Sequence, residues 1–362
     1  MSGKHYDAVV VGGGVIGLSC AWRLAQRGAR VAVLDASDPP DGATRVAAGM
    51  LAPVGELTFG EPRLLELTLA AAELYPDFVA ELEAASGNST GYARHGALHV
   101  ALDRDEAGEL QRIHELQRSL GLEAEWLPPG RCRELEPGLT PSFHGGVHAP
   151  GEAAVDPRAL VAALRRALEA EGVELLFGTE AAEAVLEDGR LTGVRTGEGR
   201  ELRAAATILA AGAWSGQAGW LPEEARPPVR PVKGQILELR TRDGSAPCER
   251  IVASERIYLV PRPDGRLIAG ATVEEQGFDT AVTAGGVHEL LREAYRLLPA
   301  VAEMELVEAM AGLRPATPDN LPLVGPAPLD GLLWATGHFR NGILLAPLSA
   351  KALADRLEGA PV

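Results

Sequence analysis

Short apolar runs and a helical pattern alternate at the start of the chain. An apolar run over 8–11 leads into a glycine-rich turn, a segment of helical periodicity continues to Gly28, and a second apolar run over 31–34 ends at Asp35. Continuous apolar runs of this length beside a helical pattern are typical of buried parallel strands. The opening of the chain therefore predicts a strand, turn, helix and strand unit.

The turn in this unit contains the motif G-x-G-x-x-G at Gly12, Gly14 and Gly17. The first glycine permits a tight turn, the second lets backbone N–H groups approach a pyrophosphate, and the third lets the helix sit close to the strand. Val15 and Ile16 begin the helix, whose N-terminus favours anions. Because the flanking strands, the helix and a following acidic residue are all present, we interpret the motif as a dinucleotide site.

The acidic residue is Asp35, at the end of the second strand, where its carboxylate can accept hydrogen bonds from an adenosine ribose. A carboxylate at this position disfavours the 2′-phosphate of NADP. It does not separate NAD from FAD, so the motif alone leaves both cofactors open.

The same kind of pattern returns twice. Asp156 and Pro157 are suited to cap and start a helix, and the apolar strand over 205–210 runs into an Ala-Gly-Ala-Trp sequence where a second strand end can meet the cofactor. Near the C-terminus, a strand over 332–336 is followed by a turn and by a helix over 343–358. These segments predict further pieces of the nucleotide-binding sheet.

The stretches between these pieces have a different pattern. Four short strands, separated in part by Asp-Gly turns, are expected at 235–239, 251–252, 257–260 and 267–270. We therefore predict an α/β protein in which an α+β domain with an antiparallel sheet is inserted into the nucleotide domain. The predicted nucleotide domain comprises 1–85, 150–222 and 312–362, and the second domain comprises 86–149 and 223–311.

A loop of small residues, TRVAAGMLAP, follows the first unit at 44–53. Small side chains near a nucleotide fold favour a loop that lies against the cofactor, although a small-residue packing turn is equally consistent with the sequence. Under the first interpretation the cofactor contacts are Thr44, Arg45, Ala47, Ala48, Gly49 and Met50.

Composition excludes several classes of function. The 34 Lys and Arg against 50 Asp and Glu give a net charge of -16, which repels nucleic acid and anionic membranes, so we expect neither as a partner. The three cysteines are far apart, which favours a reducing compartment over a disulfide framework. His144 and His148 flank two glycines without a helical pattern, so we predict no metal site. We expect a cytoplasmic protein.

Several sequence strings together resemble one known family. GGGVIGLSCAWRLAQRG with VAVLD, AAGMLAP, ILAAGAWS, AGLRPATPDNLPLVG and above all ATGHFRNGILLAP are similar to the FAD-dependent D-amino-acid oxidase superfamily. Within it the similarity is greatest to glycine oxidases of the ThiO type. The resemblance covers the whole chain and implies a Rossmann-like FAD-binding domain of the glutathione-reductase-2 type with an inserted substrate domain.

The resemblance also implies a reaction. A non-covalently bound FAD would take a hydride from the α-carbon of glycine, or of sarcosine or a small D-amino acid. The imine would hydrolyse to glyoxylate and ammonia, and O2 would be reduced to H2O2. In this family such a product can feed thiamine thiazole synthesis, so thiazole synthase is a partner to expect, and relatives imply a homo-oligomer.

The resemblance assigns roles to particular residues. Arg314 would bind the substrate carboxylate, Tyr258 would add a hydroxyl group, and Arg340 would lie near the substrate or the flavin. Alternatively, Arg314 is a surface arginine, Tyr258 is a buried structural tyrosine, and Arg340 balances charge. The remaining predicted cofactor contacts are Ala211, Gly212, Trp214, His338, Arg340, Asn341, Gly342, Ile343 and Leu344.

Two departures from the family pattern affect the prediction. Arg256 stands two residues before Tyr258, where these glycine oxidases often have histidine, so the preference among glycine, sarcosine and D-amino acids stays open. No cysteine follows Cys248, which favours a dissociable flavin. Two interpretations compete with an oxidase. One is a dehydrogenase that passes electrons to a quinone, and the other is a flavin- or NAD-binding sensor with a decayed site.

Overall fold

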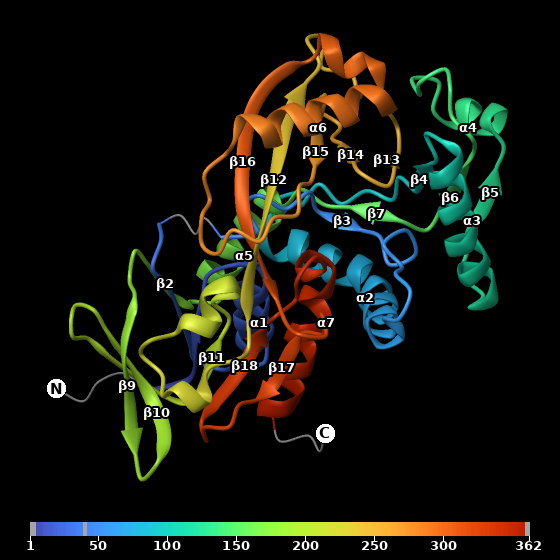
Figure 1. The fold of residues 1–362 in the computed structure, drawn as a ribbon. Coiled ribbons are helices and arrows are strands. Elements are labelled where there is room, and N and C mark those ends of the chain that lie inside the picture. Colours follow the sequence, from blue (N-terminus) through green and yellow to red (C-terminus); the bar gives the residue numbers. More distant parts are fainter. Residues whose placement is uncertain (1–4, 39–41, 359–362) are drawn as a thin grey trace.

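The computed structural model describes residues 5–38 and 42–358, and two large sheets organise it (Figure 1). One sheet has the order β17-β18-β11-β1-β2-β8, with β10 and β9 attached at β11; the other has the order β16-β12-β15-β14-β13-β4-β6-β5. The outermost parts of the predicted nucleotide domain, 1–4 and 359–362, lie outside the described residues. The α/β class predicted from the sequence is confirmed.

The first sheet is mainly parallel, and helices cover it. Its strands are β1 (His5–Val11), β2 (Val31–Asp35), β8 (Glu174–Phe177), β9 (Ala181–Glu187), β10 (Arg190–Thr196), β11 (Glu201–Leu209), β17 (Leu323–Pro326) and β18 (Leu332–Thr336). The helices are α1 (Val15–Gln26), α2 (Pro62–Ser86), α5 (Pro157–Ala170) and α7 (Gly342–Leu357). In β1, Ala8 and Val10 point into the core shared with α1, α5 and α7, whereas Val9 and Val11 point into the core on the opposite side. Burial on both faces explains why β1 reads as an unbroken apolar run.

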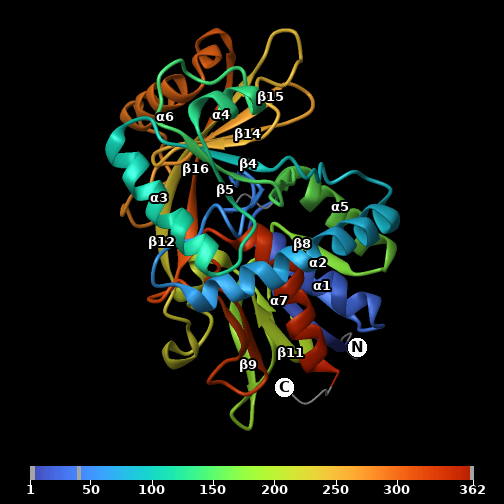
Figure 2. The same ribbon diagram turned by 90° about the vertical axis from the view of Figure 1, so that its right-hand side faces the viewer.

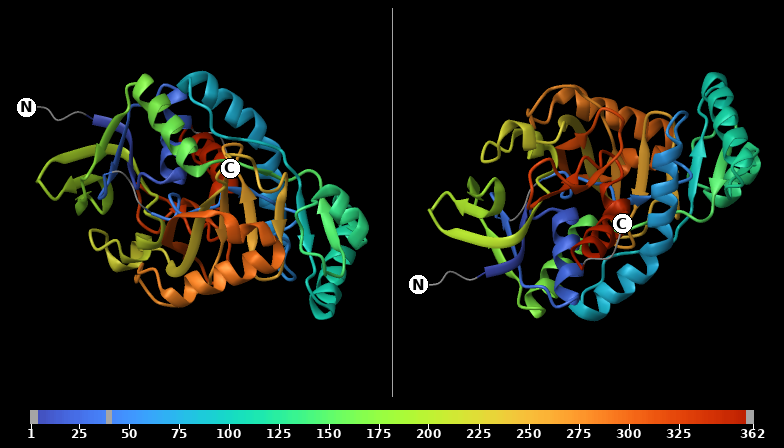
Figure 3. Two further views of the ribbon diagram at one scale, coloured as in Figure 1. Left: turned by 90° about the horizontal axis from the view of Figure 1, so that it is seen from above. Right: turned by 90° about the horizontal axis from the view of Figure 1, so that it is seen from below.

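The second sheet is mainly antiparallel. Its strands are β4 (Ala97–Val100), β5 (Glu125–Leu127), β6 (Gly146–Ala149), β12 (Arg230–Arg240), β13 (Ile251–Ala253), β14 (Tyr258–Pro261), β15 (Arg266–Gly270) and β16 (Glu305–Ala316). Helices α3 (Arg104–Ser119), α4 (Pro129–Leu135) and α6 (Ala284–Leu297) accompany it, with short 3-10 helices at Gly212–Gln217, Glu223–Ala225 and Pro299–Glu303. Figure 3 shows the segment that carries α3, β5 and α4 projecting from one side of the molecule, the side that faces the viewer in Figure 2.

Local signals in the sequence place several element ends correctly. Asp103 caps α3 by accepting hydrogen bonds from the N–H groups of Asp105 and Glu106. Asp156 caps α5 in the same way, and Pro157 is its first residue. These carboxylates satisfy N–H groups that have no partner inside the helix.

The structure also departs from the predicted elements. Strand β16 runs from Glu305 to Ala316, so the predicted domain boundary between 311 and 312 falls inside it. Helix α4, strand β5, strand β17 and a small pair formed by β3 (Met50–Leu51) and β7 (Ala153–Ala154) are additional. Each is at most seven residues long, too short for a periodic pattern to develop. None of the helices described is long and apolar enough to cross a membrane.

Candidate active site

A cavity of about 880 Å³ is lined by residues from both sheets. The carboxyl ends of β1, β2 and β11 border one part of it, and β12, β14 and β16 border another. Ligand sites in α/β folds lie at the carboxyl ends of parallel strands. The lining residues include all of the sequence-predicted site residues except Gly17, Asn341 and Leu344.

The glycine motif of the first turn packs as its spacing predicts. A Cβ on Gly12 would lie 2.3 Å from the carbonyl oxygen of Ala210, and a Cβ on Gly17 would lie 1.9 Å from that of Gly12. Gly17 therefore lies beneath the cavity and allows α1 to approach β1. Gly12 also has φ of +120°, a conformation that side chains disfavour.

The N-terminus of α1 faces the cavity without an acidic cap. Its N-cap is Gly14, the first turn has no acidic residue, and the N–H of Val15 donates to the Oγ1 of Thr44 over 3.1 Å. At the end of β2, the Asp35 carboxylate accepts hydrogen bonds from the N–H groups of Gly13 (2.7 Å) and Ser37 (2.9 Å). This arrangement fits a pyrophosphate at the helix end and a ribose beside the carboxylate.

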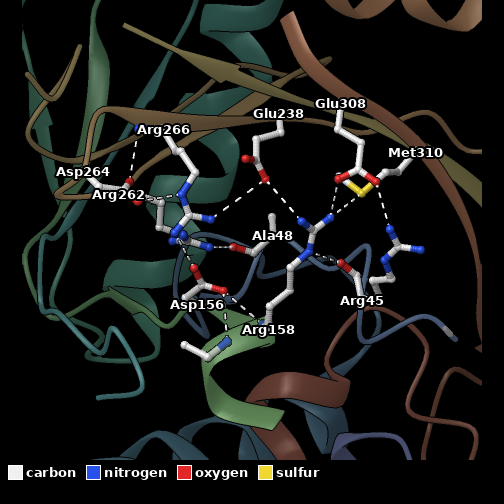
Figure 4. Close-up of polar contacts among 11 residues, drawn as sticks. Arg45, Ala48, Asp156, Arg158, Glu238, Arg262, Asp264, Arg266, Glu308 and Met310 are labelled. Carbon is white, nitrogen blue, oxygen red and sulfur yellow. Dashed lines mark hydrogen bonds and ion pairs between the residues drawn. The ribbon is translucent and has the colours of Figure 1, made fainter. Parts of the chain in front are cut away.

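The small-residue loop at 44–50 is held by a polar cluster that joins the two sheets (Figure 4). Arg262 is 3% exposed and donates from Nη2 to the Ala48 carbonyl over 2.5 Å, and burial lowers the pKa of its guanidinium to about 10. Arg45 bonds to Glu308 over 3.0 Å, and Arg158 reaches the same carboxylate over 2.8 Å. Arg45 lines the cavity, but its guanidinium is engaged with the second sheet.

The turn before α7 forms another wall of the cavity. His338 is buried, and its Nε2 lies 2.8 Å from the Oγ of Ser349; burial lowers its pKa to about 3, so the ring is uncharged at neutral pH. Phe339 has a positive φ of 46°, and its N–H donates to the Pro315 carbonyl. Gly342 and Ile343, at the start of α7, line the cavity.

Two predicted contacts at this turn lie elsewhere. Asn341 is the N-cap of α7, although its side chain makes no capping hydrogen bond. Leu344 is 1% exposed and belongs to the core between the helices and the first sheet. Of the remaining predicted residues, Ala211, Gly212 and Trp214 line the cavity, and the ring of Trp214 packs against Phe278 with 6.0 Å between centroids.

Arg314 and Tyr258 meet in the second part of the cavity because two glycines leave space for them. A Cβ on Gly234 would lie 2.3 Å from Nη1 of Arg314, and a Cβ on Gly270 would lie 2.6 Å from the hydroxyl oxygen of Tyr258. The Arg314 Nη1 donates to the carbonyl of Thr272 over 3.0 Å and to that of Lys233 over 3.4 Å. Sequence reasoning singled out neither glycine.

The charges in this part of the cavity do not pair off. Among residues 5–38 and 42–358, no carboxylate lies within 4.0 Å of the charged groups of Arg314 or Arg340. Glu56 also lines the cavity; burial raises the pKa of its carboxyl, and the charges of Arg340 and Arg314 oppose that rise. Burial likewise raises the pKa of Tyr258, and Arg314 opposes it. The site therefore offers cations and one carboxyl to a small ligand.

Sequence reasoning missed Glu56, because no local pattern in the sequence marks it. Arg256, the departure from the family pattern, is exposed and does not line the cavity in the described part of the chain. The hydrogen bond from the Glu106 N–H chiefly holds the pKa of the Asp103 carboxyl below its usual value, and the charge of Arg256 adds to this effect.

The nucleotide fold, the glycine cradle and the unpaired arginines define a flavin-dependent oxidoreductase site. The chain belongs to the FAD dependent oxidoreductase family, which it matches over residues 7–356, and its cofactor is FAD. The cavity fits this group, since the uncapped start of α1 and the glycine turn match a pyrophosphate.

Two kinds of relative are similar over nearly the whole chain. The bifunctional protein ThiO/ThiG of Trichormus variabilis is 39% identical over 351 residues, which are 96% of this chain and 52% of that protein. The glycine oxidase of Geobacillus kaustophilus is 35% identical over 98% of this chain and 93% of its own length. A crystal structure of glycine oxidase from the same organism superposes with a TM-score of 0.91 over 99% of this chain and 96% of that one. The chain spans about half the length of the bifunctional relatives.

Proposed function

We propose that this protein is an oxidase of glycine, or of sarcosine or another small amino acid. A hydride leaves the α-carbon, the imine is hydrolysed to glyoxylate and ammonia in the case of glycine, and O2 becomes H2O2. The observation that carries the proposal is the unpaired guanidinium of Arg314 beside Tyr258, in the cavity of an FAD-dependent family. The similarity to named glycine oxidases supports the choice of substrate.

Arg314 is suited to bind the substrate carboxylate. Its Nη1 is oriented by two backbone carbonyls, which leave donors of the guanidinium for a ligand. A carboxylate accepts two parallel hydrogen bonds from a guanidinium, and Tyr258 adds a hydroxyl donor. Because burial raises its pKa, Tyr258 stays a neutral donor at physiological pH. The carboxylate is thus held in one orientation, which presents the α-carbon to the cofactor.

Glu56 is suited to the other end of the substrate. A bound amino acid places its ammonium group opposite its carboxylate, and Glu56 supplies the acidic group in this part of the cavity. Hydride removal requires a neutral amine, and a carboxyl whose pKa is raised toward that of the amine is a better proton acceptor than an exposed one. We assign to Glu56 the role of receiving that proton.

FAD, when bound, accepts the hydride and passes the electrons to O2. The backbone N–H groups at Gly342 and Ile343 and the N-terminus of α7 place partial positive charge at the cavity wall. Negative charge that develops nearby is stabilised by this helix end. His338 remains neutral and keeps the turn bonded to Ser349 within α7.

The residues proposed to hold FAD line the cavity and come from several elements. They are Gly12, Gly14, Val15, Ile16, Asp35, Thr44, Arg45, Ala47, Ala48, Gly49, Met50, Ala211, Gly212, Trp214, His338, Arg340, Gly342 and Ile343. Gly17, Asn341 and Leu344 do not line the cavity, and we propose that they pack behind the residues that do. The domain division predicted from the sequence is retained as a proposal.

The test is to purify the protein, record its visible spectrum, and follow peroxide with glycine, sarcosine, D-alanine and D-proline in air. We expect a yellow protein that releases FAD on denaturation and makes peroxide with at least one of these amines. A yellow protein that is bleached by substrate without making peroxide indicates the quinone-linked dehydrogenase instead. A protein that cannot be reconstituted with FAD contradicts the proposal.

We also propose a physiological role in thiamine thiazole synthesis. The name of the Trichormus relative joins ThiO with ThiG in one polypeptide, and this chain matches about half of that length. Thiazole synthase, the partner inferred from the sequence, would then take up the imine or glyoxylate. To test this role, the rate of product formation by purified thiazole synthase is measured with this oxidase and glycine, and again with peroxide-free glyoxylate. We expect the first rate to be higher. The proposals of a homo-oligomer and of a cytoplasmic location are tested by light scattering and by cell fractionation.

A further inference from the structure

The short segment 52–57, which carries Glu56 into the cavity, is bound from behind by side chains distant in sequence. The N–H of Gly55 donates to the Glu152 carboxyl group, and Nε2 of Gln117 donates to the Val54 carbonyl over 2.9 Å. A Cβ on Gly55 would lie 2.2 Å from Nε2 of His99 and 2.9 Å from Oε2 of Glu152. The segment is therefore closely packed against these three side chains.

These three side chains come from one part of the molecule. His99 lies on β4, Gln117 on α3, and Glu152 between β6 and β7. We call this part, residues 97–152, the lateral projection; Figure 1 shows it on the right, next to the blue loop between β3 and α2. The projection contributes no residue to the cavity lining among the described residues. Its contact with segment 52–57 is its link to the site.

The binding groups are uncharged; Glu152 and Gln117 are buried, and His99 is partly buried. Glu152 is 1% exposed, and burial raises the pKa of its carboxyl to about 8; burial also lowers the pKa of His99 to about 4. Oε2 of Glu152 and Nε2 of His99 are both buried, and neither has a hydrogen-bond partner among the described residues. A neutral Glu152 holds the Gly55 N–H without placing a full negative charge behind Glu56.

We propose that Glu152, supported by His99 and Gln117, is a positioning residue for Glu56. The lateral projection thereby sets the amine side of the substrate site, although it does not line the cavity. This inference rests on the proposed role of Glu56 in amino-acid oxidation. A displaced segment 52–57 would weaken interactions with the amine and leave the Arg314 side of the site intact.

The experiment compares Glu152→Ala and Glu152→Gln with a matched control, Glu136→Ala. Glu136 is a buried acid in the same projection that accepts hydrogen bonds from the N–H groups of Glu249 and Arg250, away from segment 52–57. Four quantities are measured in each holoenzyme: the KM for glycine, the Kd for acetate from the flavin spectrum, the Tm, and hydrogen exchange of the Gly55 and Glu56 amides.

In Glu152→Ala we expect KM to rise about fivefold, the Kd for acetate to stay within twofold, and the Gly55 amide to exchange faster, because one buried hydrogen bond is lost. Glu152→Gln keeps a neutral acceptor and should restore KM and exchange. Glu136→Ala should lower Tm without changing KM. If Glu152→Ala does not fold, Gln117→Leu replaces it, with a KM rise of about threefold expected from loss of the bond to the Val54 carbonyl.

The two proposals fail in different ways. Unchanged KM and unchanged Gly55 exchange in Glu152→Ala, in an enzyme that oxidises glycine, overturn the positioning role. An equal KM rise in Glu136→Ala also overturns it, because a general loss of stability would then be the cause. A wild-type holoenzyme that oxidises none of the four amines contradicts the proposed function, and the role inferred from it falls with it.

Discussion

The two parts of the cavity are built from different chemical groups. At the proposed nucleotide end, the groups that face the cavity are largely backbone N–H groups of a turn and a helix end. Glycine is needed there at Gly12 and Gly17, because a side chain would collide with the backbone. At the proposed substrate end, the groups that line the cavity are the side chains of Arg314, Tyr258 and Glu56, which come from two strands and a loop. At the substrate end, glycines on neighbouring strands leave the space that Arg314 and Tyr258 occupy.

This difference predicts different responses to substitution. Changes at the nucleotide end should act on cofactor binding and stability together, because the backbone forms both the fold and the site. Changes at the substrate end should act on KM and leave bound FAD in place. The following predictions run from the largest expected effect to the smallest.

Gly17→Val should abolish FAD binding. Its Cβ would lie 1.9 Å from the Gly12 carbonyl oxygen, so α1 must move away from β1, at a cost of about 3 kcal/mol or more. Flavin content and thermal unfolding measure the effect. Gly108→Ala is the control, since no atom lies within 4 Å of that Cβ position. A yellow Gly17→Val protein of normal Tm would contradict the packing argument.

Arg314→Ala should raise KM for glycine by at least about tenfold through loss of a charge-assisted pair, with FAD still bound. Steady-state kinetics and the flavin spectrum measure the two effects separately. The matched control is Arg256→His, which changes an exposed residue outside the cavity lining and should alter KM by less than about twofold. Unchanged KM in Arg314→Ala would remove this residue from the substrate site.

Gly234→Ala should raise KM by about fivefold, a smaller effect than that of Arg314→Ala because the guanidinium can shift without being lost. The added Cβ would lie 2.3 Å from Nη1. In the double variant the two effects should not add, because the residues share one interaction. Additive effects measured in this cycle would show that Gly234 acts independently of Arg314.

The stability of the substrate end should depend on pH through Glu152. Its pKa in the folded protein is about 8, above the usual 4.5, so the folded state binds the proton more tightly than the unfolded chain. The resulting stability is present at low pH and is lost as pH rises from about 4.5 to about 8, by at most about 1.4 kcal/mol per pH unit. His99 and Glu56 are the titratable groups that face it.

Thermal unfolding between pH 5 and pH 9 tests this prediction. Glu152→Gln cannot ionise, so the Tm of this variant relative to wild type should rise across that range. A difference in Tm that is constant with pH would show that Glu152 does not hold a proton in the folded protein.

Prediction from sequence succeeded where the determinants are local. The turn at Gly12, the cap Asp156, and the strand that leads to Ala211 each depend on a few consecutive residues. Glu56 was missed because no local pattern marks it. Its proposed role depends on Arg314 and Arg340, which are more than 250 residues away in the sequence. The buried groups behind it were missed for the same reason.

The sequence by itself determined the glycine turn, the α/β class and the family, because strand, turn and helix signals act over short distances. Only the tertiary structure decided that Glu56 shares a cavity with Arg314, that Gly234 and Gly270 make room for the substrate groups, and that a lateral projection holds segment 52–57. Contacts between distant strands depend on how the two sheets pack, and burial and pKa values depend on those contacts.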